Sequence, residues 1–174
     1  MRGGGEKRVA EITGNTDFED ILFLLAKHDV KYLIVGGLAF SQYARPRNTK
    51  DMDLWIESSR ENVVRANAAL AEFGSPYILD PCHTSEVLQI GVAPNRVDIL
   101  AEIEGVRFAT AWGKRKVKEL GSVKANWVDL DTLLRIKSRI KSPRHQEDAR
   151  VLRDVKKKMK EKTKTKSKKQ GRTR

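Results

Sequence analysis

The chain has 174 residues, a formal net charge of +12 at pH 7 and a single cysteine. This length supports one domain with one hydrophobic core, so the fold needs neither disulfides nor a structural metal. Cys82 lacks a partner for an internal disulfide, no Cys/His spacing indicates zinc, and no apolar stretch approaches the roughly 20 residues of a membrane helix. These features exclude a disulfide-stabilised or membrane-spanning protein and favour a cytoplasmic one.

The first predicted elements are a helix and a buried strand. Residues 1–15 begin with a Gly-rich, charged segment, and we expect them to form a flexible N-terminus. Thr16 can serve as an N-cap with Glu19 at the capping-box spacing, and apolar residues follow at helical intervals: Phe18, Ile21, Leu22, Leu25 and Ala26. The apolar run Tyr32-Leu-Ile-Val35 then stops at Gly36-Gly37, which is typical of a buried strand entering a tight turn.

The middle of the chain predicts a short helix over 38–43, a loop over 44–50 and a strand over 51–56 that alternates acidic and apolar residues. Ser58 or Ser59 can cap the next helix, which ends at Gly74. Two strands near 86–92 and 96–103 follow, separated by a hairpin turn at 93–95. The apolar stripe predicted for the helix is Val63, Val64, Ala66, Leu70 and Phe73.

Residues 112–124 look irregular and basic, and two helices are predicted after them. Asp129 or Asp131 can cap the first, which carries Leu133, Leu134 and Ile136 on one side. Pro143 separates it from a final helix that runs from His145 to about Lys158. The sum is an α/β or α+β domain over 16–155, in which a small mixed sheet is flanked by helices and followed by a C-terminal helical segment.

Most of the net charge lies in a tail, residues 156–174. The tail contains nine Lys and two Arg against the single acid Glu161, so it carries +10 and the rest of the chain only +2. Such a segment buries little apolar surface, and we expect it to be disordered. Two interpretations stay open: a solubilising tail, or a segment that attracts RNA, DNA or another polyanion through counterion release.

Three acidic residues suggest metal-dependent chemistry. Asp51 and Asp53 are two apart on one predicted strand, so both carboxylates project from the same face. Asp98 alternates with Val97 and Ile99 on another strand, and would join them if the two strands are neighbours. Three carboxylates can hold a pair of magnesium or manganese ions that act on a phosphoryl group. The alternative is a solvated strand face, which is the common reason for an Asp-x-Asp.

Gly36-Gly37 lies between a buried strand and a helix, where backbone N–H groups can receive phosphate oxygens. The order of parts is therefore strand, Gly-Gly, helix, loop and Asp-x-Asp strand. In this order the chain contains Val35-Gly-Gly-Leu-Ala39, Arg47-Asn-Thr-Lys-Asp-Met-Asp-Leu54 and Arg96-Val-Asp98. These segments resemble the DNA-polymerase-beta-type nucleotidyltransferase superfamily, and within it the small AbiEii-like proteins, several of which are toxins of type IV toxin–antitoxin systems. The resemblance extends from about Tyr32 to Leu152.

Carried over by position, the resemblance implies a nucleotidyltransferase-like fold with a two-metal site. Asp51, Asp53 and Asp98 would hold Mg²⁺ or Mn²⁺, and Asp98 would also act as a base toward the acceptor hydroxyl. Gly36 and Gly37 would bind the phosphates of an NTP, the donor substrate.

Three further residues receive roles only from the resemblance. Lys137 would reach the triphosphate, and Arg47 and Thr49 would fix the loop or contact the nucleotide. The segment from Arg144 to Asp148 keeps the Arg and Asp of the family's C-terminal pattern but separates them differently, so we assign no role to Asp148.

The sequence thus predicts an enzyme that moves an NMP from an NTP to an acceptor hydroxyl and releases pyrophosphate. An RNA or tRNA end is the favoured acceptor, a protein or small molecule is the alternative, and an antitoxin protein is an expected partner of the resembled group. The rival hypothesis is a catalytically silent module of the same fold that binds nucleic acid or a partner protein. The presence of all three acids favours the enzyme.

Overall fold

The computed structural model describes residues 16–170, which form one six-stranded mixed sheet with six helices around it. The strand order is β3-β4-β2-β1-β6-β5, so β1 and β2 from the first half of the chain lie side by side at the centre, with two later strands on either side. The predicted fold class is confirmed. The flexible N-terminus predicted for 1–15 lies outside the described residues. No helix within 16–170 is both long and apolar enough to cross a membrane.

The centre of the sheet consists of β1 (Tyr32–Val35), β2 (Asp51–Ile56) and β4 (Arg96–Leu100). β2 pairs antiparallel with β1 and parallel with β4, and β3 (Leu88–Ile90) closes that edge antiparallel to β4. All four residues of β1 are buried, as a strand with neighbours on both sides requires. The four predicted strands are therefore present, although β3 and β4 are shorter than the strands expected near 86–92 and 96–103.

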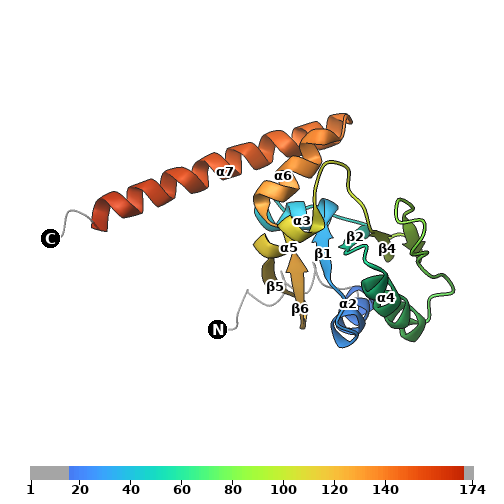
Figure 1. Cartoon of the computed structure of the whole chain (residues 1–174). Coiled ribbons are helices and arrows are strands. Elements are labelled where there is room, and N and C mark those ends of the chain that lie inside the picture. The colour runs from blue at the N-terminus through green and yellow to red at the C-terminus, as the bar shows by residue number, and fades with distance from the viewer. Residues whose placement is uncertain (1–15, 171–174) are drawn as a thin grey trace, which may run out of the picture.

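Two helices of the first half pack on each other beside the sheet. They are α2 (Thr16–Lys27) and α4 (Arg60–Phe73), seen together at the lower right of Figure 1. Ser59 caps α4 by accepting a hydrogen bond from the Asn62 N–H, and Gly74 ends it in the left-handed conformation, as predicted. The predicted stripes are buried or half-buried apart from Ala26 and Val64, which face solvent.

The remaining helices are α3 (Gly36–Tyr43), α5 (Phe108–Lys114), α6 (Leu130–Arg139) and α7 (Pro143–Gln170). α6 and α7 pack on each other and on α3, so the chain's last helices return to the Gly-Gly segment. Asp129 is the α6 cap, since its side chain accepts from two backbone N–H groups of the first turn.

The prediction of an irregular segment over 112–124 was wrong. The chain there completes α5 and forms the hairpin β5 (Lys116–Leu120) and β6 (Val123–Trp127), with β6 parallel to β1. Four of the five β5 residues are exposed, so this edge strand lacks the buried apolar alternation that marks strands in a sequence. The turn between the strands does carry a sequence signal, which is Gly121. This residue adopts a φ of +60°, a conformation that favours glycine.

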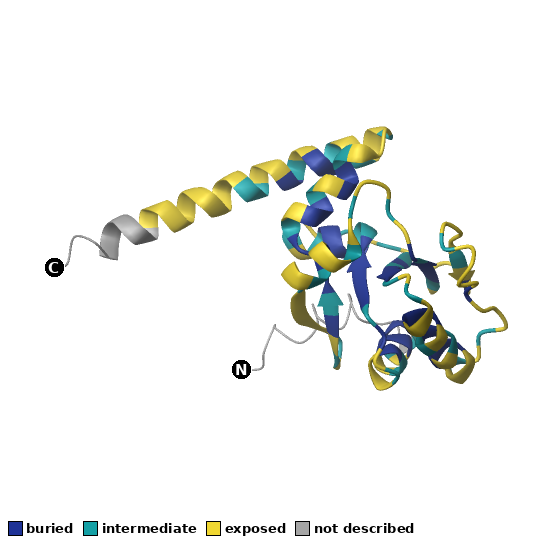
Figure 2. Cartoon of the chain, in the orientation of Figure 1, coloured by how far each residue is buried: buried dark blue, intermediate teal, exposed yellow. Residues whose placement is uncertain are grey.

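The described part of the expected disordered tail, residues 156–170, is helical and continues α7 well beyond the predicted end near Lys158. Lys, Met and Glu are good helix formers, and no Gly or Pro interrupts the segment before Gly171. Figure 1 shows this part of α7 extending away from the body, and its residues 156–165 are largely exposed (Figure 2). The division into a domain over 16–155 and a separate tail stays a prediction.

Candidate active site

The three predicted acids lie on one face of the sheet, on neighbouring strands. Met52 and Leu54 are fully buried on the opposite face of β2, which directs Asp51 and Asp53 to the other side. Asp98 is the register partner of Asp53 across the parallel β2–β4 pair, and partners in register point to the same face. The sheet therefore brings Asp98 to the side of Asp51 and Asp53, although it lies 45 residues after Asp53 in the sequence.

Asp53 lies in surroundings that disfavour its negative charge. Burial raises its pKa to about 6, and the negative charges of Asp98 and Asp51 act in the same direction. Lys137 and a hydrogen bond from the Gly37 backbone N–H oppose the shift without cancelling it. A positive group placed at this carboxylate would therefore be bound favourably.

Arg96 supplies positive charge to the other two acids. Its Nη2 lies 3.0 Å from Oδ2 of Asp51 and 3.0 Å from Oδ2 of Asp98, so the guanidinium bridges β2 and β4. The hydrogen bond with Asp98 and the charges of the acids raise the pKa of Arg96, which stays protonated. The sequence analysis assigned Arg96 no role. Its position two residues before Asp98 on a strand was the available signal, because that spacing places both side chains on one face.

The donor chemistry of the acids suits a divalent cation, although their arrangement is that of an ion pair with arginine. Carboxylate oxygens are the ligands that Mg²⁺ and Mn²⁺ prefer, and the buried Oδ1 of Asp98 lies 2.9 Å from Nε of Arg96, in an ion pair. Within 16–170, however, no three His, Cys, Asp or Glu side chains are grouped as a ligand set. The oxygen atoms of the predicted ligands suit a divalent cation. For Asp51 and Asp98 to bind one, their ion pairs with Arg96 would have to break.

The Gly-Gly turn packs directly against Asp53. Gly36 has a φ of +67°, and a Cβ added there would overlap the Asp53 carboxylate. A Cβ on Gly37 would lie 2.9 Å from Cγ2 of Thr49, on the loop that leads into β2. The turn is thus held between an acid and a loop residue that were both predicted to belong to the site, with the start of α3 facing the same region.

Gly36→Ala is expected to lower both stability and NTP binding, because the added methyl displaces Asp53 and the left-handed backbone costs about 1 to 3 kcal/mol. The melting temperature and the dissociation constant for an NTP measure the two effects. Gly74→Ala is the matched control: Gly74 also has a positive φ, +88°, but nothing lies within 4 Å of the added Cβ. Equal effects of the two variants on NTP binding would show that the contact with Asp53 is unimportant.

A cleft of about 790 Å³ opens beside these residues, a volume in the range of ordinary ligand pockets. Its lining includes six residues that the sequence analysis assigned to the site: Gly36, Gly37, Thr49, Asp51, Asp53 and Lys137. Asp98 and Arg47 are not among the lining residues. Arg96 does line the cleft, and it forms an ion pair with Asp98. Six polar lining residues were not assigned to the site: Asn48, Lys50, Arg96, Glu102, Arg144 and His145.

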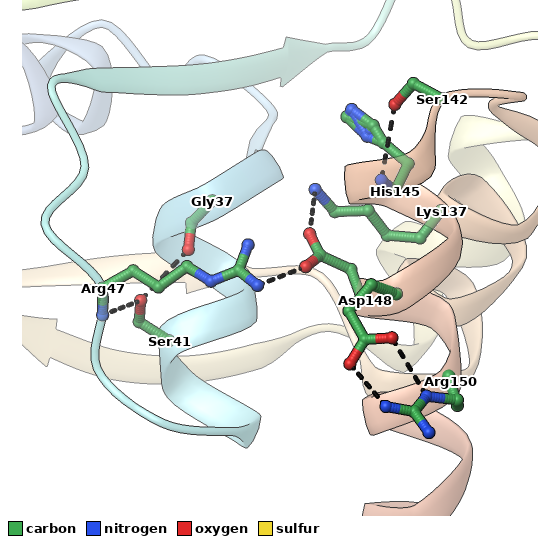
Figure 3. A network of polar contacts seen from close by, with 9 residues as sticks. Gly37, Ser41, Arg47, Lys137, Ser142, His145, Asp148 and Arg150 are labelled. Atoms are coloured by element: carbon green, nitrogen blue, oxygen red, sulfur yellow. Dashed lines mark hydrogen bonds and ion pairs between the residues drawn. The ribbon is translucent and has the colours of Figure 1, made fainter.

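Asp148, to which the sequence analysis assigned no role, is the centre of a buried ion network behind the cleft. Its side chain is 1% exposed and contacts Arg47 through Oδ1 and Lys137 through Oδ2, the latter at 3.1 Å. Figure 3 shows the two cations reaching this carboxylate from different elements. The network joins α7, α6 and the loop before β2, which are the three segments that surround the Gly-Gly turn.

Arg47 connects the loop before β2 to α3 and α7. Its guanidinium lies over the Phe40 ring at 4.1 Å and pairs with Asp148. Its backbone N–H donates to Oγ of Ser41, and that hydroxyl donates to the Gly37 carbonyl oxygen. Contact of Arg47 with a nucleotide stays a prediction.

Lys137 connects the ion network to the acids. Only 6% of its side chain is exposed, its Nζ pairs with Asp148, and its charge acts on Asp53 from the cleft side. His145 lies nearby, and burial together with the positive charge of Lys137 lowers its pKa, so the imidazole is neutral at pH 7. The ammonium group of Lys137 is therefore held in place by Asp148, beside both the cleft and Asp53 on β2.

No family model and no curated protein matches the sequence. Among solved structures, the chain is similar to the solution structure of the antibiotic-resistance factor ANT(2'')-Ia, with a TM-score of 0.52 and 14% identity over 90% of this chain and 96% of that one. The crystal structure of ANT(2'')-Ia in complex with adenylyl-2''-tobramycin gives a TM-score of 0.49 and 16% identity over 79% and 86% of the two chains.

A third similar structure is that of an antigenic nucleotidyltransferase-like protein from Paracoccidioides brasiliensis, with a TM-score of 0.47 and 13% identity over 82% of this chain and 76% of that one. At such identities a structural likeness concerns the fold, and the AbiEii-like subtype stays a prediction. The first likeness covers nearly the whole of both chains. The chain therefore has a nucleotidyltransferase-like fold.

Proposed function

We propose that the protein transfers a nucleoside monophosphate from an NTP to an acceptor hydroxyl and releases pyrophosphate. The observation that carries this proposal is the packing of the Gly36 turn against Asp53 at the edge of the cleft. The Gly-Gly turn, to which we assign phosphate binding, and an acid with raised pKa are there within contact of each other. This combination suits a reaction in which a phosphate chain must be held beside a cation site.

The chain's own groups have distinct tasks in this reaction. Backbone N–H groups at the start of α3 hold the phosphates, while Asp51, Asp53 and Asp98 would hold one or two divalent cations. When bound, such cations neutralise charge on the attacking and leaving oxygens. Asp98 takes the proton of the acceptor hydroxyl. The hydroxyl oxygen then forms a bond to the α-phosphorus, and the bond from the α-phosphorus to the α–β bridging oxygen breaks with its electron pair leaving on pyrophosphate.

Lys137 and Arg96 supply the remaining positive charge. Lys137 is fixed by Asp148, so its ammonium group needs no reorganisation to face the triphosphate. Arg96 bridges Asp51 and Asp98, so these acids would have to give up the bridge to hold a cation, and the guanidinium would then face the cleft that it lines. There it can pair with phosphate oxygens in a bidentate manner.

The favoured acceptor is an RNA or tRNA end, since the net charge of +12 attracts polyanions. A protein hydroxyl and a small molecule are the alternatives. A role as the toxin of a toxin–antitoxin pair, with an antitoxin protein as partner, follows from the resemblance in the sequence.

Incubating the purified protein with magnesium, α-labelled NTPs and either tRNA, total protein or aminoglycosides identifies the acceptor. We expect label in the RNA fraction that depends on magnesium. Label confined to protein or to the small molecules would refute the RNA acceptor and leave nucleotidyl transfer intact. The chemical control is EDTA, which should stop all labelling.

A catalytically silent module is the second candidate, and the Arg96 bridge favours it. An arginine that permanently neutralises Asp51 and Asp98 would leave no place for a cation. Manganese titration followed by electron paramagnetic resonance separates the two. An enzyme is expected to change the signal relative to the same mixture of Mn²⁺ and NTP without protein, whereas a silent module would leave the signal of that mixture unchanged.

A further inference from the structure

A second groove, of about 620 Å³, lies away from the cleft between the distal part of α7, the start of α6 and the β5 edge. Its lining contains five lysines from two separate walls. α7 contributes one wall, and the end of α5 with the start of β5 contributes the other. The lysines are Lys114, Lys116, Lys156, Lys160 and Lys164. We call this feature the lysine groove.

The two acids in the lysine groove do not balance its charge. Asp129 is engaged in capping α6 and also accepts a hydrogen bond from the Thr132 hydroxyl. Asp131 pairs with Lys156 at 2.8 Å. Lysines of both walls act on Asp131, because the pKa of its carboxyl is lowered by Lys156 first and then by Lys114 and Lys160. The groove is therefore a concentrated positive site.

The residues of α7 that line the groove lie on one face of this helix. The α7 residues that line it are spaced three and four apart along one helix face: Lys156, Met159, Lys160, Thr163 and Lys164. Lys158 and Lys162 are equally exposed but are not part of the lining. The same helix thus offers two pairs of lysines that differ in whether they face the groove.

The floor of the groove is partly apolar. Leu130 and Met159 are among its lining residues, and Met159 is 53% exposed although it is a large hydrophobic side chain. A groove with a basic rim and an apolar floor suits a nucleic acid, because the lysines can bind the phosphates while the bases pack against the apolar side chains.

We propose that the lysine groove binds the sugar-phosphate backbone of a nucleic acid. Lysines on two walls meet phosphates from both sides of one strand, and the release of condensed counterions drives the association. The α7 helix begins at the cleft, where His145 is a lining residue, and reaches Lys160 about 22 Å later at 1.5 Å per residue. About six or seven stacked nucleotides cover that distance. The binding site does not depend on the proposed activity.

The test compares two double variants of the full-length protein in a fluorescence-anisotropy titration with a labelled, unstructured RNA of about 20 nucleotides. Lys160→Gln/Lys164→Gln removes two charges from the groove, and Lys158→Gln/Lys162→Gln removes two from the other side of the same helix. We expect the groove variant to lose about five- to tenfold in affinity at low salt and to reduce the salt slope by about 1.5. The control variant should change either quantity by less than about twofold.

Lys114→Gln/Lys116→Gln, on the opposite wall, should weaken RNA binding as much as the groove variant on α7. A DNA strand of the same sequence distinguishes the nucleic acids: binding of both, or of RNA alone, supports a backbone site. Equal losses in the α7 groove and control variants would overturn the proposal, because any lysine of α7 would then serve. Binding to phosphatidylserine vesicles or to an acidic peptide in place of both nucleic acids would also overturn it.

Melting temperature and NTP affinity of each variant keep the two proposals separate. The substituted lysines are exposed, so both quantities should equal those of the unmodified protein. If the groove variant loses RNA binding and keeps NTP binding, the lysine groove is established whether or not nucleotidyl transfer is ever observed.

Discussion

Asp53→Asn is expected to lower the rate of nucleotidyl transfer at least about a thousand-fold, because it removes the central carboxylate of the proposed cation site. The substitution keeps the size of the side chain and an oxygen that accepts the Gly37 N–H. Folding is therefore preserved, and the loss reports on charge alone. Asp154→Asn, which removes an exposed acid on α7, serves as the control and should leave the rate unchanged.

The same variant should be more stable than the parent protein when no metal is present. The pKa of Asp53 is raised in the fold to about 6 from an ordinary value of 3.8, so its ionised form opposes folding above pH 6. Allowing for partial exposure, the penalty is about 1 to 2 kcal/mol, which corresponds to a gain of about 3 to 6 °C in melting temperature at pH 8. The gain should shrink as the pH falls from about 6 toward 4, where the carboxylate becomes protonated in both states.

Thermal unfolding in EDTA at pH 8 and at pH 4 measures this difference, and a rate assay at saturating NTP measures the catalytic loss. A variant that turns over normally would remove Asp53 from the site. A variant that is less stable than the parent at pH 8 would show that the fold does not disfavour the negative charge of Asp53.

Asp148→Asn is expected to lower the free energy of unfolding by about 3 kcal/mol, because it leaves the buried cations Arg47 and Lys137 without a counter-ion. The melting temperature should fall by about 6 to 12 °C. Glu147→Gln is the matched control on the neighbouring residue. Its pair with Arg150 is exposed on both sides, so its removal should cost less than about 1 kcal/mol.

A double-mutant cycle identifies the cause of the Asp148 effect. In the Lys137→Met background one of the two cations is absent, and Asp148→Asn should then cost clearly less than in the parent. The Km for NTP should also rise in Asp148→Asn, since Lys137 loses the contact that positions it. Additive losses of stability in the cycle would refute the ion network as the source of the effect.

The parts of the site that were predictable are those that local spacing controls. Asp51 and Asp53 share a face because strands have a period of two, and Gly36 ends a buried strand where a tight turn is needed. The third acid, Asp98, was predictable only on the condition that its strand lies beside β2. That condition is a matter of sheet order, and the parallel β2–β4 register fulfils it.

The parts that were missed depend on contacts between distant segments. Asp148 is recognisable as a site residue only when α7 is packed against α6, because its partners lie 101 and 11 residues earlier in the chain. The lysine-rich strand β5 escaped detection because an exposed edge strand carries no buried stripe. The distal part of α7, residues 156–170, was predicted to be disordered because composition indicates low burial but does not distinguish an exposed helix from a coil.

Parallel reactions with ATP labelled at the α-phosphate and at the γ-phosphate test the central claim most directly. The account predicts that α-label appears in the acceptor, that γ-label appears only in pyrophosphate, and that both signals vanish in Asp53→Asn. Transfer of γ-label to the acceptor, or release of labelled inorganic phosphate with no labelled acceptor, would contradict nucleotidyl transfer at this cleft.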